Sequence, residues 1–283
     1  MSLREPCLPP GWFPRDGKKI AEFLEPFANG ASAGANGTKC RSAAAVAPHA
    51  GWYYSGACAA LAVSSLDPEA ETVAVIGGHL PGGMPVLAAM EEGVKTPLGT
   101  ISIDQELRDE FGRQLSVRPD RYQDNTVEVL LPMVQYFFPR SKLLWLRFPA
   151  ELSSFDAGKL LAGTASSLGR RIAVLASTDL THYGDNYGYS PMGRGKAALE
   201  WVKKVNDAAF IGAVLEGDPA AALKRAEEDR SACSAGAVLG ALGFAAASGK
   251  TEGRLLDYRT SADAGGDDEP PASFVGYAAI LLG

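Results

Sequence analysis

The order of apolar segments in the first third of the chain constrains the fold most strongly. The short apolar run AAAVAP is followed by SGACAALAVSSL, which suits a helix, and then by a second apolar run, TVAVIGG. Two short buried strands joined by a helical crossover form a βαβ unit, because parallel strands need a long connection. We therefore expect parallel strands in a sheet that helices cover.

The same alternation continues along the chain. KLLWLRF and RIAVLAS indicate further strands around the helical segment FDAGKLLAGTASSL, LGTISID indicates another strand, and Gly193 to Gly249 is helical almost throughout. GRLLDYRTS and SFVGYAAILL then form two closing strands. The pattern predicts a single α/β domain over residues 1–283, with a mainly parallel or mixed sheet, helices on both faces and an antiparallel edge. Residues 28–39 and 263–273 have the composition of flexible loops.

Composition and charge exclude several classes of protein. Lys and Arg total 27 against 33 Asp and Glu, so the net charge of -6 argues against a nucleic-acid partner. No apolar run reaches the roughly 18 residues of a membrane span, and charges and prolines interrupt the start MSLREPCLPPGWF. We therefore expect a cytoplasmic protein without a membrane partner. Four scattered cysteines without a CxxC pair support neither a disulfide framework nor a zinc ribbon.

Each of the three histidines follows a predicted strand. They are His49 in VAPHAGWYYSG, His79 in VIGGHLPGG and His182 in LASTDLTHYGD. Ligands of open α/β sheets bind beyond the carboxyl ends of the strands, so these side chains can converge in one site. Taken singly, each histidine is as well explained as a hydrogen-bonded loop residue. Together they favour a polar site in which neutral imidazole binds a metal ion.

Asp179 and Cys233 are further candidates. Asp179 lies three residues before His182, where a carboxylate could orient the imidazole or share proton transfer, although an aspartate here could equally cap the following turn. Cys233 begins a helix of small residues, and the positive end of the helix dipole favours a metal-binding thiolate. A cysteine among alanines is, however, usually only a small buried hydrophobic residue.

Aromatic residues beside the histidines are candidates for the walls of a pocket. We expect Trp52 and Tyr54 on one side and Tyr183 on the other, because their rings combine an apolar body with a polar edge. Core packing explains these residues equally well. The glycines around His79 fit neither GxGxxG nor GxxxxGK[ST], so no nucleotide site is expected.

Two of these segments resemble signatures of the Memo family. VAPHAGWYYSGACAA is similar to its A-P-H-A-G-[YW]-x-Y-S/C-G signature, and STDLTHYG resembles its S-S-D-[LF]-S/C-H-[YW] segment. Weaker similarities in REPCLPPGWFP, KTPLGTISID, NTVEVLLP and SFVGYAAILL extend the resemblance over nearly the whole chain. The resemblance implies a fold shared with class III extradiol dioxygenases, which bind non-haem iron through two histidines and a carboxylate. Memo-like proteins have a cysteine in place of that carboxylate.

The resemblance also implies a role for each candidate residue. His49, His79 and Cys233 become the ligands of a divalent transition metal, with iron(II) first and copper or zinc next. Asp179 and His182 become the neighbouring acid–base pair. Radical-SAM and AMMECR-type proteins are implied as pathway partners.

The chain departs from the family pattern at three places. The loop before His79 is one residue shorter, Ser234 replaces the glycine that follows the family's cysteine, and Asn125 stands where a histidine is expected. Two functions stay open: a dioxygenase-like oxidoreductase of an unknown small molecule, and a non-catalytic protein that binds a peptide or small ligand in the ancestral cleft. A zinc hydrolase is less favoured, because no general-base glutamate adjoins a ligand histidine.

Overall fold

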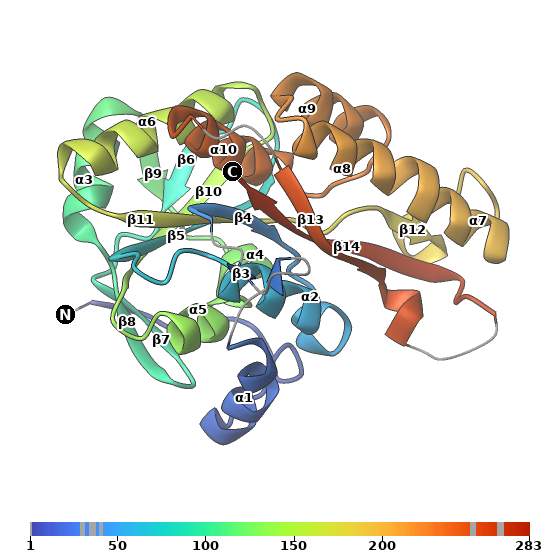
Figure 1. Cartoon of the computed structure of the whole chain (residues 1–283), viewed down its shortest axis with the longest axis horizontal. Coiled ribbons are helices and arrows are strands. Elements are labelled where there is room, and N and C mark those ends of the chain that lie inside the picture. Colours follow the sequence, from blue (N-terminus) through green and yellow to red (C-terminus); the bar gives the residue numbers. More distant parts are fainter. Residues whose placement is uncertain (1, 29–31, 34–37, 40–41, 250–252, 265–268) are drawn as a thin grey trace.

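The computed structural model describes residues 2–28, 32–33, 38–39, 42–249, 253–264 and 269–283. In this part of the chain a mixed sheet of nine strands lies at the centre, in the order β12-β14-β4-β11-β5-β10-β6-β9, with β13 paired to β14 (Figure 1). Its four inner parallel strands are β4 (Ala44–Ala47), β11 (Ile172–Ser177), β5 (Thr72–Leu80) and β10 (Lys142–Pro149). The predicted α/β fold with a mixed sheet is thus confirmed.

Both borders of the sheet contain antiparallel pairs. On one side β14 (Ser273–Leu282) runs antiparallel to β4 and to its other partners, β13 (Gly253–Thr260) and β12 (His182–Gly184). On the other side β6 (Val86–Ala88) runs antiparallel to β10 and pairs with β9 (Val117–Pro119). The two closing strands therefore form the antiparallel edge that the sequence predicts.

Helices cover both faces of the sheet (Figure 1). One face packs against α2 (Trp52–Ser64) and α5 (Leu131–Phe137), and the other against α6 (Ser153–Ser167) and α10 (Ala235–Ala247). Successive residues of a strand point to opposite faces, so Val73 and Val75 enter the first core while Ala74 and Ile76 enter the second. Burial on both faces explains why these strands read as continuous apolar runs.

The remaining helices lie around these two layers. They are α1 (Gly17–Leu24), α3 (Gln105–Gln114), α4 (Asn125–Glu128), α7 (Lys196–Trp201), α8 (Asp207–Leu215) and α9 (Pro219–Glu228). A π-helical turn, η4 (Val202–Asn206), joins α7 to α8, and short 3-10 turns occupy Glu25–Phe27, Asp185–Tyr187 and Ser261–Ala264. Such π-helical turns often occur at functional sites, and η4 supports the site described below.

Some expectations from the sequence need correction or fall outside the described residues. LGTISID forms β8 (Gly99–Ser102), which pairs with β7 (Gly93–Thr96) in a separate sheet that β1 (Leu3–Arg4) completes on the other side of β7. Of the expected loop at 28–39, Ser32–Ala33 and Thr38–Lys39 pair as short strands β2 and β3. Residues 29–31, 34–37 and 265–268 of the two expected loops lie outside the described residues.

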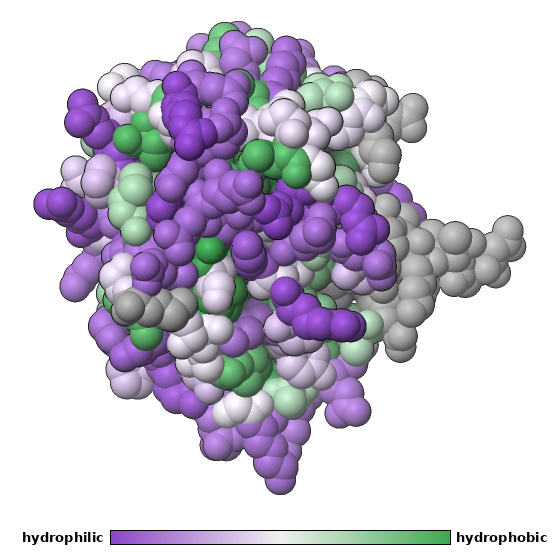
Figure 2. All heavy atoms as spheres, turned by 90° about the vertical axis from the view of Figure 1, so that its left-hand side faces the viewer, coloured by the Kyte–Doolittle hydropathy of each residue, from purple (hydrophilic) through white to green (hydrophobic). Residues whose placement is uncertain are grey.

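The described helices include none that is both long and apolar enough to cross a membrane. The face of the molecule in Figure 2 is mostly hydrophilic, with hydrophobic residues in small separate patches. Two of the exposed large apolar side chains, Tyr53 and Tyr54, lie instead beside the candidate site.

Candidate metal centre

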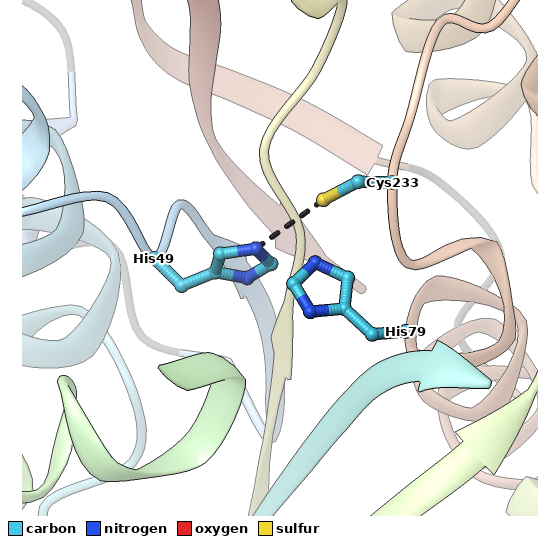
Figure 3. A group of neighbouring side chains, drawn as sticks. All are labelled: His49, His79 and Cys233. Atoms are coloured by element: carbon cyan, nitrogen blue, oxygen red, sulfur yellow. Dashed lines mark hydrogen bonds between the residues drawn. The ribbon is translucent and has the colours of Figure 1, made fainter. Parts of the chain in front are cut away.

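Three potential metal ligands from distant parts of the chain meet at the carboxyl ends of the inner strands. The ligand atoms of His49, His79 and Cys233 all lie within 4.8 Å of one another. Cys233 Sγ is 3.2 Å from His49 Nε2, and the two imidazole rings meet edge to face with their centroids 5.0 Å apart. Figure 3 shows the three side chains pointing toward a common centre. Two imidazoles and a thiol form a donor set that suits iron, copper or zinc.

The environment of His49 fixes the orientation of its ring. His49 follows β4, next to the end of β11, where Ser177 Oγ lies 2.9 Å from His49 Nδ1. The backbone N–H of His49 donates to Asp179 Oδ1 at 2.7 Å, and its carbonyl oxygen accepts a hydrogen bond from Asn125 Nδ2 at 3.0 Å. With Nδ1 held by Ser177, Nε2 faces the sulfur of Cys233.

His79 is held from its opposite side by Asp124, which also pairs with Arg147. Its Nδ1 lies 3.0 Å from Asp124 Oδ2, and the same oxygen accepts a hydrogen bond from Arg147 Nη2 at 3.2 Å. Arg147 also donates from Nε to the carbonyl oxygen of Gly78 at 2.9 Å. As for His49, Nδ1 is occupied, so Nε2 remains for a metal. A carboxylate on the non-ligating nitrogen is the usual support of a metal-binding histidine.

The sequence places His79 and His182 after strands, whereas the structure places both within strands. β5 continues through His79 to Leu80, and its pairing with β10 is irregular between Arg147 and Pro149. At this irregularity His79 adopts a left-handed backbone with φ +57°, which is uncommon for a residue other than glycine. His182 begins the short strand β12, opposite Val275 of β14.

The protonation of the cluster follows from its neighbours. Burial lowers the pKa of His79, but the hydrogen bonds with Asp124 and Cys233 and the charges of these two groups together outweigh it and raise the pKa to about 10. Burial raises the pKa of the Cys233 thiol, yet the charge of His49 and the hydrogen bonds with His49 and His79 together bring it well below its usual value. Without a metal, these shifts favour a thiolate beside protonated imidazoles. A metal ion bound here would displace the imidazole protons.

Asp179 and His182 lie beside the cluster without a direct hydrogen bond to each other. Asp179 Oδ2 is 3.9 Å from His182 Nε2 and 4.0 Å from His49 Nε2, so it acts on both rings through its charge. Burial raises the pKa of Asp179, but the charge of His49, the nearby His182 and the hydrogen bond from the His49 backbone N–H together lower it. The ring of His182 stacks on Tyr187 with centroids 4.9 Å apart. All three histidines therefore lie at one edge of the sheet.

Further buried groups fix the loop that carries Asp179 and His182. Asp207, directly after the π-helical turn, accepts hydrogen bonds from the backbone N–H and the hydroxyl of Thr181 and from Tyr258 Oη. Asn206 Nδ2 donates to Thr181 Oγ1 at 2.9 Å. Burial raises the pKa of the Asp207 carboxyl to about 6, although these hydrogen bonds favour the charged form.

Comparison with known proteins assigns the family. The chain matches the model of the Memo-like protein family over residues 4–281. It belongs to the Memo family. The chain is 30% identical over 296 residues to a MEMO1 family protein of Pyrococcus abyssi, with 99% of each chain covered. It is 34% identical over 246 residues to one of Methanosarcina mazei, covering 84% of this chain and 85% of the relative.

Among solved structures, one match is an uncharacterized protein, JW3007, of Escherichia coli K12. It is 14% identical to this Memo-family chain, with a TM-score of 0.43, and the match covers 83% of this chain and 98% of that one. A likeness this low does not test the expected relation to extradiol dioxygenases.

The two candidate ligand histidines of this Memo-family protein border an open cavity of about 620 Å³. His49, His79, Asp179 and His182 line it together with Asn125, the residue at which the resemblance to the family leads us to expect a histidine. Its aromatic walls consist of Trp12, Tyr53, Tyr54, Tyr187 and Tyr277. Of the three aromatic residues expected in the pocket, Tyr54 lines this cavity.

Trp52 and Tyr183, also expected in the pocket, are instead buried in apolar cores. Trp52 packs between the rings of Phe13 and Phe23, and its indole N–H donates to the carbonyl oxygen of Val129 at 3.0 Å. Tyr183 stacks on Phe274 with centroids 5.0 Å apart. Core packing, the alternative that the sequence left open, explains both positions.

The supporting polar residues of the Memo site have no recognisable signature in the sequence. Ser177, Asp124, Arg147 and Asp207 stand singly in strands or at helix starts, where no local pattern distinguishes them. The one available signal is indirect, since an arginine within the apolar strand KLLWLRF needs a buried partner. The structure supplies Asp120 and Asp124 as its partners.

Proposed function

We propose that this Memo-family protein binds a divalent transition metal through His49 Nε2, His79 Nε2 and Cys233 Sγ, and uses it in the dioxygenase-like oxidation of a small molecule. The observation that carries the proposal is the convergence of these donors within 4.8 Å, with both Nδ1 atoms already held by Ser177 and Asp124. Mixed imidazole and thiolate donors favour iron(II), with copper or zinc next, over calcium or magnesium.

The surrounding residues supply binding and proton transfer. A bound metal would contribute redox chemistry at coordination positions that the three protein ligands leave open. His182 faces the same cavity and would accept or return a proton at its ring. The buried Asp179 carboxylate would stabilise the protonated form of that ring, 3.9 Å away. The tyrosines of the cavity wall would hold an uncharged, ring-bearing substrate.

A second candidate is a non-catalytic protein that binds a peptide or small ligand in the same cavity. Asn125 favours it, because an amide that donates to the His49 carbonyl oxygen replaces the titratable histidine of the family.

We also propose that the protein has radical-SAM and AMMECR-type pathway partners and a cytoplasmic location. Membership of the family supports both proposals.

Calorimetric titration with iron(II) under anaerobic conditions, then with copper and zinc, tests the metal site. We expect His49→Ala and Cys233→Ser to weaken binding at least about 100-fold, because each removes a ligand of an open site. Cys7→Ser is the matched control, since Cys7 contacts Glu128 outside the cluster. Equal affinity of the wild type and His49→Ala would refute the assignment, and lost binding in His182→Ala would make His182 a ligand.

Oxygen consumption by the iron-loaded protein distinguishes the two candidate functions. With a panel of catechols and related phenols, an oxidoreductase should consume oxygen, and His182→Ala should slow turnover about 100-fold while retaining most metal affinity. Substrate binding without oxygen consumption would favour the non-catalytic protein. A His182→Ala variant that turns over at the wild-type rate would remove His182 from the proposed chemistry.

A further inference from the structure

A second, smaller cavity of about 320 Å³ reaches the candidate metal centre from another direction. His182 and Tyr187, whose rings stack, line both cavities and form their shared wall. Among the three candidate ligands, His49 and His79 line the larger cavity, whereas Cys233 lines the smaller one. Cys233 therefore borders a space that differs from the aromatic cavity.

The described linings of the two cavities differ in their permanently charged side chains. The larger cavity presents the carboxylates of Asp179 and Glu269 and, among its described lining residues, neither lysine nor arginine. The smaller cavity presents the guanidinium of Arg230, and the residues described around it include no carboxylate. Since an arginine is charged at any ordinary pH, the smaller cavity offers an anion a permanent positive charge.

The fold holds Arg230 in place at this cavity. Its backbone is left-handed, with φ +50°, and its guanidinium lies over the ring of Tyr189 at 5.4 Å from the centroid. Tyr189 Oη and Asn206 Nδ2 both donate to the carbonyl oxygen of Asp229, the residue before Arg230, at 2.8 and 2.9 Å. A strained backbone that its neighbours fix in this way is characteristic of binding sites.

The charge of Arg230 is also not neutralised by an ion pair with any described residue. The adjacent Asp229 carboxylate pairs with Arg225 at 3.0 Å, and no carboxylate in the described part of the chain lies within ion-pair distance of Arg230. Its planar donors remain available to the two oxygens of a carboxylate, which they match in geometry.

We propose that the smaller cavity is a binding site for a small carboxylate, which Arg230 holds beside the sulfur of Cys233. The volume accommodates a ligand of several non-hydrogen atoms, and the apolar side chains of Leu180, Ala226 and Ala232 complete its lining. The site does not depend on a bound metal, so it can be tested separately from the proposed oxidoreductase function.

Alkylation of Cys233 in the full-length, metal-free protein provides the test. Iodoacetate carries the carboxylate, and iodoacetamide is its neutral counterpart of nearly equal size. In both reactions the Cys233 thiolate forms a bond to the CH₂ carbon and iodide leaves with the electron pair of the broken C–I bond. Mass spectrometry of the Cys233 peptide gives the two rates. The ratio of iodoacetate to iodoacetamide rate cancels changes in the reactivity of the sulfur itself.

In the wild type, we expect the alkylation rate of Cys233 to saturate as the iodoacetate concentration rises. Arg230→Ala should lower the ratio of the iodoacetate rate to the iodoacetamide rate about fivefold, which corresponds to the loss of one solvent-accessible ion pair. Acetate should protect Cys233 of the wild type and fail to protect Arg230→Ala. Lys224→Ala is the matched control, because Lys224 lies on the preceding helix α9, pairs with Glu228 and does not line the cavity. Arg230→Lys should recover part of the ratio, because it restores the charge.

An unchanged ratio in Arg230→Ala would overturn the proposal. Equal losses with both reagents would also overturn it, because they would indicate altered access or folding in place of charge recognition. Labelling confined to Cys7 would show that the smaller cavity does not admit the anion to Cys233, and would overturn it as well. An iodoacetate-specific loss in a variant with an unchanged thermal midpoint supports it.

Discussion

The buried carboxyl of Asp207 offers a quantitative prediction about stability. This side chain is completely buried, it accepts hydrogen bonds from Thr181 and Tyr258, and burial raises its pKa from 3.8 to about 6. Between these two values the folded state binds more protons than the unfolded state, so Asp207 reduces stability progressively as the pH rises from 4 toward 6. Above pH 7 the ionised Asp207 lowers the free energy of unfolding by about 3 kcal/mol, because its pKa differs between the two states by roughly two units at 1.36 kcal/mol each.

Asp207→Asn removes this ionisation while keeping the size of the side chain and one acceptor for Thr181. The stability of the variant relative to the wild type should therefore increase by about 2 kcal/mol between pH 4 and pH 7.5. Urea unfolding at several pH values in this range measures the difference. Asp156→Asn is the control, because Asp156 is 79% exposed and the substitution changes the net charge equally.

Two results would refute this reasoning. A difference between wild type and Asp207→Asn that does not vary with pH would mean that Asp207 titrates alike in the folded and unfolded states. The same pH dependence in Asp156→Asn would assign the effect to net charge, since burial differs between the two sites.

The remaining predictions concern packing and the support of the ligands. Gly158→Ala should cost about 3 kcal/mol in urea unfolding, because its Cβ would lie 1.9 Å from a backbone oxygen of α10, whereas Gly163→Ala on the same helix meets no atom within 4 Å and should gain up to about 1 kcal/mol. Trp52→Phe should cost about 1 kcal/mol by losing its hydrogen bond, and a large loss of metal affinity would contradict its place in the core. Asp124→Asn should weaken metal binding about 10- to 100-fold in calorimetry, and unchanged affinity would contradict its support of the second ligand histidine.

Local pattern identifies the central strands and the helices that cover them. Strands buried on both faces must be apolar at every position, so TVAVIGG and RIAVLAS are recognisable as strands from their residues alone. LGTISID shows the limit of this argument. Its alternating pattern specifies a strand but not its partner, and the partner is β7 in a separate sheet.

Aromatic residues show the same limit at the site. Trp52 and Tyr54 stand two positions apart at the start of one helix, and the sequence placed both in the pocket. Residues two apart on a helix do not share a face, so Trp52 enters the core while Tyr54 lines the cavity.

The sequence by itself determined the chemical inventory of this protein: an α/β sheet, two histidine segments of the Memo family and a cysteine at the start of a helix. Tertiary structure alone decided that these donors meet and what supports them. Strand order brings the ends of β4, β11 and β5 side by side. At the end of β5, the left-handed backbone of His79 directs its side chain into the cluster. Asp124 and Arg230 acquire their roles the same way, because hydrogen bonds and cavities join residues that are neighbours only in space.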